Sequence, residues 1–262
     1  MSRSGMWQDG AFRLRAAVFV MLVLPVLGVP RAGRAGDAAE LKLLGASAGG
    51  RYVAYMQSGA RDGSGSPYAW VDFFDVTHDR PVSGAKPIRV GGREGDTLSL
   101  ARTERQARSK AQATLQKLGI AAAHAGRVLL SHPLTDLGVD SLEARLSVSK
   151  QLAGLGSQDL RLTLTPLPMA GGRCYSDERL LGLAATLRDM QSGAEVTLHR
   201  DSSLTAADGC PIAYRIGEVR LPGAEPANGK VTGRPVLVLV QVFSTGFEGH
   251  DMRWKPIGGR LP

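Results

Sequence analysis

Alternating apolar and polar residues dominate the chain after about residue 40, and this spacing predicts strands. Near the start, "RYVAYMQSG" and "YAWVDFFDV" are rich in β-branched and aromatic residues, which favour a pleated sheet. Gly49, Gly50 and the segment "RDGSGSP" fit the turns between them. We therefore expect residues 36–92 to form a β-meander, with its clearest strands between Glu40 and Val82.

Residues 97–118 break this pattern, because their apolar side chains recur at helical spacing. Asp96 is the expected N-cap and Gly119 the expected stop signal, so we predict one amphipathic helix within residues 96–119. Its expected apolar stripe is thin and rich in alanine: Leu100, Ala107, Ala111, Leu115 and Leu118.

Strand-like alternation returns over residues 120–262, except at residues 136–156, where the pattern is ambiguous. The run "VLVLVQVF" is apolar on both faces, which is typical of a strand buried between two layers. The predicted fold is mainly β, with antiparallel sheets in a sandwich-like or truncated propeller-like arrangement and one long amphipathic helix near 97–118. A sandwich is slightly favoured, because the helix leaves too little chain for a five-bladed propeller.

An uncharged tract, "AAVFVMLVLPVLGV", covers residues 16–29 and follows Arg13 and Arg15. As a helix it would span about 21 Å, which is short of a hydrocarbon core of about 30 Å. Its length predicts a cleaved signal peptide, whereas an uncleaved amino-terminal anchor is the alternative.

Small residues after the apolar tract offer peptidase sites after Ala35 or after Ala38. Cleavage after Ala35 is favoured, because Gly33 and Ala35 then occupy the −3 and −1 positions. We expect a signal peptide over residues 1–35 and a single β-rich exported domain over 36–262, periplasmic or secreted, with no stable membrane span.

Charge affects the interpretation of the sequence only at the predicted helix, residues 97–118. The chain carries a formal charge of +8, which falls to +4 without residues 1–35, and the helix alone accounts for +4. The basicity is therefore a weak argument for nucleic acid, and no nucleic-acid partner is expected. A weak contact of the 97–118 helix with an anionic surface stays open, although an ordinary solvated face is the favoured interpretation.

Two cysteines, Cys174 and Cys210, are the whole complement of the chain. Because an exported chain meets oxidising machinery, we predict that they form one disulfide within the β-rich part, residues 120–262. The bridge would close a loop of 36 residues and stabilise the fold by about 3.8 kcal/mol in the chain-entropy model.

Catalytic motifs are weak. The chain has no G-x-S-x-G elbow and no H-E-x-x-H pair, and we expect no metal or other cofactor. The strongest candidate is the loop "STGFEGHD", in which Glu248, His250 and Asp251 could act as acid, base or ligand. A polar loop without catalytic function is the favoured interpretation.

Two resemblances narrow the class of protein. Residues 45–55, "GASAGGRYVAY", resemble the strand entry of a β-propeller blade. The ordered set "GRYVAY", a basic Ala-rich helix, "DGCPIAYRI", "VFSTGFEGHDMRW" and "GRLP" resembles a bacterial family of predicted secreted proteins of unknown function. That resemblance implies export and a shared fold, with no activity or site to transfer.

The expected function is a non-catalytic binding or scaffold module of the bacterial cell envelope, whose partner is an unknown envelope protein or a glycan. This expectation follows from export combined with the lack of a catalytic constellation. The alternative is a periplasmic hydrolase that uses the Glu248–Asp251 loop.

Overall fold

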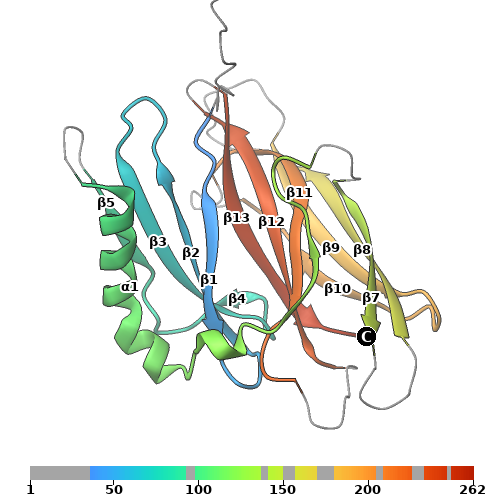
Figure 1. The fold of residues 1–262 in the computed structure, drawn as a ribbon. Coiled ribbons are helices and arrows are strands. Elements are labelled where there is room, and N and C mark those ends of the chain that lie inside the picture. Colours follow the sequence, from blue (N-terminus) through green and yellow to red (C-terminus); the bar gives the residue numbers. More distant parts are fainter. Residues whose placement is uncertain are drawn as a thin grey trace, which may run out of the picture. The chain divides into compact units, whose positions relative to one another are not determined.

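Antiparallel strands make up most of the part of the chain that the structure, a computed structural model, describes (Figure 1). The described residues are 36–92, 98–136, 141–149, 157–169, 180–204, 209–225, 233–246 and 249–262. The predicted signal peptide, residues 1–35, lies outside them.

The first sheet, here called the helix-bearing sheet, is the predicted meander. Its strands are β1 (Glu40–Ala46), β2 (Tyr52–Ala60), β3 (Pro67–Asp75), β4 (Arg80–Pro81) and β5 (Ile88–Gly91). β1 to β4 follow one another in order, and β5 pairs with β3. The turn before β2 needs glycine at position 50, where φ is +71° and a Cβ would lie 2.3 Å from the carbonyl oxygen of Pro222.

The predicted helix is α1 (Leu100–Lys117), and it is shorter than the sequence suggests. Ser99 is the N-cap, since its side chain accepts a hydrogen bond from the backbone N–H of Arg102. The expected cap, Asp96, lies outside the described residues. The buried side chains of α1 are Thr103, Ala107, Ala111 and Leu115. The three apolar residues of this set share a core with the helix-bearing sheet, where small alanines allow close packing.

The central sheet has the order β13-β12-β11-β6. It contains β6 (Arg127–Ser131), β11 (Pro211–Leu221), β12 (Pro235–Thr245) and β13 (His250–Arg260). A short 3₁₀ helix, η1 (Ala122–His124), precedes β6. The last three strands form a meander, and β6 joins its edge from much earlier in the chain.

The outer sheet is a second meander, with the order β10-β9-β8-β7. Its strands are β7 (Glu143–Ser149), β8 (Ser157–Pro168), β9 (Leu181–Asp189) and β10 (Glu195–Arg200). β7 occupies the stretch whose sequence pattern was ambiguous. Its alternation is short, with Ala144, Leu146 and Val148 buried and the residues between them turned away from the core.

The central sheet is covered on both faces. Leu237 and Leu239 of β12 share a core with the helix-bearing sheet, whereas Val236, Val238 and Val240 share a core with the outer sheet. Figure 1 shows β12 and β13 between β1 on one side and β8 and β9 on the other. The structure therefore confirms the predicted fold class, mainly β with antiparallel sheets and one long helix, and the predicted burial of "VLVLVQVF".

Candidate functional site

A group of ionisable side chains around His199 joins all three sheets. We call Asp79, His199, Asp201 and Lys255 the His199 cluster. A register shift in β10 between Thr197 and His199 sets His199 opposite Ala185, a residue of the core. Because such a bulge lets consecutive side chains share a face, His199 joins Leu198 on the inner side of the outer sheet.

Both ring nitrogens of His199 meet a carboxylate. Nδ1 lies 2.5 Å from Asp79 Oδ2, and Nε2 lies 2.8 Å from Asp201 Oδ1. Burial alone would lower the pKa of His199, but the hydrogen bonds to Asp201 and Asp79 outweigh it and raise the pKa from 6.5 to about 9. At neutral pH the ring is therefore an imidazolium that donates both protons.

The two carboxylates are held from several elements. Asp79 lies in the turn between β3 and β4, where it has φ +49°, and its Oδ1 accepts from the backbone N–H of Gly258 at 2.9 Å. Asp201 Oδ2 accepts from the backbone N–H of Leu183 at 2.8 Å, and Lys255 Nζ lies 3.0 Å from Asp201 Oδ1. Burial opposes ionisation of Asp201, yet its hydrogen bonds with His199 and Lys255 hold its pKa well below the usual range. The cluster thus ties the helix-bearing, outer and central sheets together.

Glycine at position 258 is required for this junction. A Cβ there would lie 2.2 Å from the carbonyl oxygen of Val76, so the turn that carries Asp79 could not approach β13 as closely. A histidine that already holds both protons cannot accept one from a substrate at neutral pH.

The predicted catalytic loop lies only partly within the described residues. Glu248 lies outside the described residues, and His250 and Asp251 are the first two residues of β13. Adjacent strand residues point to opposite faces, so the structure does not bring these two side chains together. His250 is exposed, and Asp251 Oδ1 accepts from the backbone N–H of Asp37 at 2.8 Å.

The structure describes one of the two cysteines of the predicted disulfide. Cys210 directly precedes β11, and Cys174 lies outside the described residues, between the end of β8 and the start of β9. The pairing stays a prediction.

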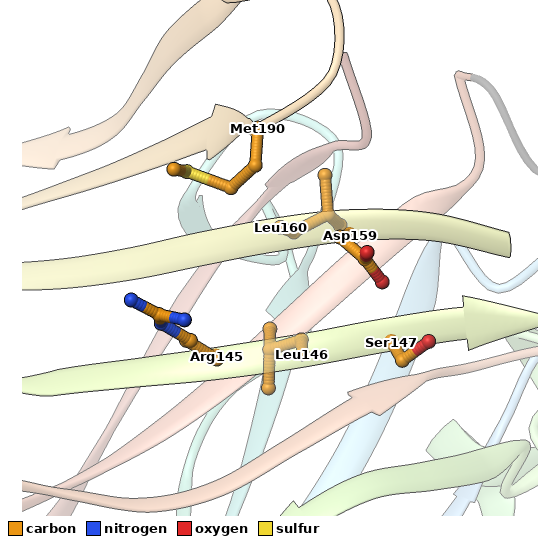
Figure 2. A pocket seen from close by; sticks show the side chains of 6 residues that line it. All are labelled: Arg145, Leu146, Ser147, Asp159, Leu160 and Met190. Carbon is orange, nitrogen blue, oxygen red and sulfur yellow. The ribbon is translucent and has the colours of Figure 1, made fainter.

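A shallow hollow of about 370 Å³ lies along the outer sheet (Figure 2). Arg145 and Ser147 of β7, Asp159 of β8 and Met190, which follows β9, line it with Leu146 and Leu160. The two leucines belong to the core, whereas Met190 is exposed. The hollow therefore presents a cation, an anion, a hydroxyl and an apolar side chain together on an open surface.

A known protein family matches most of the chain. The family described as "Predicted secreted protein (DUF2259)" matches residues 54–260. The chain belongs to this family. The match begins within β2, leaves out β1 and covers α1 and the rest of the three sheets, and it confirms the resemblance to a family of predicted secreted proteins. No curated protein and no solved structure matches the chain.

A membrane-crossing helix is not found among the described residues, where none is both long and apolar enough. The same residues contain no group of three or more His, Cys, Asp or Glu side chains arranged to hold a metal ion.

Sequence reasoning missed the His199 cluster entirely. Plain alternation in "AEVTLHR" assigns Leu198 and His199 to opposite faces, and only the bulge brings both inward. The hollow was not predicted either, because the pattern of residues 136–156, which contain β7, is ambiguous.

Proposed function

We propose that the protein is an exported, non-catalytic binding or scaffold module of the cell envelope, and that it works in the periplasm or after secretion. The observation that carries this proposal is that the ionisable side chains of the His199 cluster are paired with one another. Its histidine lies between two carboxylates, and one of these carboxylates also contacts Lys255. The half-buried ionisable groups here neutralise one another and serve cohesion rather than turnover.

The hollow on the outer sheet is the binding surface that this proposal favours. Arg145 and Asp159 can pair with polar groups of a protein or a glycan, and Met190, 43% exposed, adds an adaptable apolar contact. This combination of polar rim and apolar contact is typical of a protein or carbohydrate interface.

The test is a retention experiment with matched variants. Wild-type protein, Met190→Ser with Arg145→Ala, and Val128→Ser are immobilised and exposed to envelope extract and to a glycan array at rising salt. Val128, 45% exposed on β6, is the matched control for Met190. We expect a ligand that survives salt, that the double variant loses and that the control keeps. Equal retention by the three proteins would contradict the proposal.

The hydrolase alternative is tested in parallel. A panel of ester and glycoside substrates is incubated with wild-type protein and with His250→Ala. Turnover by the wild type that the variant loses would favour the Glu248–Asp251 loop as an active site. The double variant of the hollow should then leave the rate unchanged.

A second candidate function is peripheral contact with an anionic surface through α1, and one observation favours it. Glu104, the acidic residue of α1, accepts from Lys42 Nζ at 2.8 Å and from Ser58 Oγ at 2.7 Å. It therefore lies on the flank next to the sheet. The Lys and Arg side chains of α1 are exposed: Arg102, Arg105, Arg108, Lys110 and Lys117.

Vesicle sedimentation distinguishes this second candidate. Arg102→Gln with Arg105→Gln should weaken binding to vesicles that contain phosphatidylglycerol, since each basic group near such a surface contributes about 1 kcal/mol. The matched control is Arg188→Gln with Arg200→Gln, two exposed positions on the outer sheet. Equal binding by both pairs, or binding that does not fall with salt, would exclude a role for the helix face.

A further inference from the structure

The segment Gly36–Ala39, which we call the strap, precedes β1 but is already built into the fold. Ala38 forms a parallel bridge with Met252 of β13. On either side of it, the backbone N–H of Ala39 donates to the carbonyl oxygen of Met252 at 3.0 Å, and the N–H of Met252 donates to the carbonyl oxygen of Asp37 at 2.9 Å. The strap thus covers part of the free edge of β13, the outermost strand of the central sheet.

Asp37 is the anchor of the strap and is only 5% exposed. The hydroxyl of Tyr68 donates to its Oδ1 at 2.8 Å, and the guanidinium of Arg253 donates to its Oδ2 at 2.5 Å and to its carbonyl oxygen at 2.6 Å. Its own N–H donates to Asp251 Oδ1 at 2.8 Å. Side chain and backbone of Asp37 are therefore both bound by the rest of the domain.

The partners of Asp37 depend on it in turn. Tyr68 is fully buried, and the guanidinium carbon of Arg253 lies 5.1 Å from the centre of its ring and 5.5 Å from that of Trp70. A domain without Asp37 would leave the buried Tyr68 hydroxyl without the carboxylate that accepts its hydrogen bond, and Arg253 would lose its ion pair while it keeps its hydrogen bond to the carbonyl oxygen of Met252. Loss of these contacts is disfavoured.

Gly36 marks the other end of the strap. Its φ is +96°, and a Cβ at this position would lie 2.1 Å from the carbonyl oxygen of His250. Only glycine satisfies both conditions. The tertiary structure therefore constrains the chain from Gly36 onward.

From this geometry we infer that the export peptidase cuts the bond between Ala35 and Gly36, and that a cut after Ala38 does not produce the native protein. Water adds across the Ala35–Gly36 peptide bond, leaving a carboxylate on Ala35 and an ammonium group on Gly36. The cut after Ala35 leaves the whole strap in place, whereas the cut after Ala38 removes Gly36, Asp37 and Ala38. This inference rests on the export that the proposed function includes.

The direct test is the first residue of the exported protein. The full chain is expressed with its own leader, the envelope fraction is purified, and intact mass and amino-terminal sequencing are measured. A mature chain that begins at Gly36 is expected. A chain that begins at Ala39, or at any other residue after the leader, overturns the inference alone. An intact chain in the cytosol overturns the proposed export together with it.

A matched pair of full-length variants tests the same bond without relying on stability. A lysine directly before the cut blocks a peptidase that requires a small residue there. Ala35→Lys should therefore accumulate as the precursor, whereas Ala38→Lys should be processed to the mature length. The reverse pattern, with Ala38→Lys blocked and Ala35→Lys processed, would place the cut after Ala38 and overturn the inference.

Discussion

Different interactions hold the two neighbouring sheets against the two faces of the central sheet. Toward the outer sheet the contact is a broad apolar core, in which Leu160, Leu162, Leu183 and Leu187 meet the valines of β12. Toward the helix-bearing sheet the apolar cluster is smaller, and hydrogen bonds supplement it. Gln57 is the clearest example, because its amide donates to the carbonyl oxygen of Trp254 at 3.0 Å and accepts from the N–H of Trp254 at 2.7 Å.

The two interfaces therefore differ in role. Apolar packing against the outer sheet favours cohesion, whereas the hydrogen bonds to the helix-bearing sheet favour one specific placement. Apolar packing stabilises without selecting one exact placement, whereas a buried amide or carboxylate is satisfied only in one placement. We therefore expect the outer-sheet interface to supply the larger share of stability, and the polar contacts at β13 to set how the helix-bearing sheet and the strap dock. The His199 cluster lies where both interfaces meet.

The predicted Cys174–Cys210 bridge would strengthen the outer-sheet side further. It would join the β8–β9 connection of the outer sheet to the start of β11 in the central sheet. We expect reduction, or Cys210→Ser, to lower the free energy of unfolding by about 3.8 kcal/mol. Chemical denaturation with and without reductant measures this. Two thiols alkylated in unreduced exported protein would contradict the pairing.

Leu162→Ala breaks the apolar interface directly. Leu162 is fully buried in the core between the central and outer sheets, so the substitution should cost about 2–5 kcal/mol through lost burial and a residual cavity. Urea denaturation reports the loss, and Val128→Ala, at an exposed position, is the control with an expected change within about 0.5 kcal/mol. A similar effect of the two substitutions would argue against the apolar core as the main source of stability.

Asp37→Ala breaks the polar interface at the strap. We expect a loss of about 2–3 kcal/mol, because the Tyr68 hydroxyl and the Arg253 guanidinium lose their shared acceptor. The double variant with Tyr68→Phe should recover part of this loss, since the buried hydroxyl is then absent. A double-mutant cycle in urea measures the coupling, and strictly additive losses would show that the two groups do not depend on each other.

The His199 cluster should make the smallest contribution to the free energy of unfolding, and that contribution should depend on pH. The folded protein binds the His199 proton more tightly than the unfolded chain, with a pKa of about 9 against 6.5. Its contribution is therefore complete below about pH 6.5 and is lost as the pH rises toward 9, with a total of about 2 kcal/mol after allowance for partial exposure.

Unfolding free energies measured between pH 6 and pH 10 test this dependence. His199→Gln should flatten the curve over that range, because glutamine does not titrate. A wild-type curve that is already flat there would contradict an imidazolium held between Asp79 and Asp201.

Sequence patterns predicted the elements well and their contacts poorly. The strands around "VLVLVQVF", the meander and the helix follow from local periodicity, which depends on neighbours in the chain. The helix start differed from the prediction, since capping depends on which of several polar residues adopts the extended backbone; here it is Ser99, with ψ 151°.

The site was harder to predict. Asp79, His199 and Lys255 come from three sheets and are far apart in the chain, so no local spacing links them. The loop with Glu248, His250 and Asp251 looked like the better candidate because its polar residues are close in sequence. The role of this loop stays a prediction, because Glu248 lies outside the described residues, while the carboxylate of Asp251 accepts from the backbone N–H of Asp37.

The sequence by itself determined most of the strands, though not β7, and it determined that "VLVLVQVF" is buried on both faces and that small residues follow the apolar tract. These are properties of residue type and local spacing. Only the tertiary structure decided that His199 points inward and that Asp37 is anchored to β13. Both depend on long-range geometry, a bulge in one strand and a carboxylate bound across 216 positions of the chain.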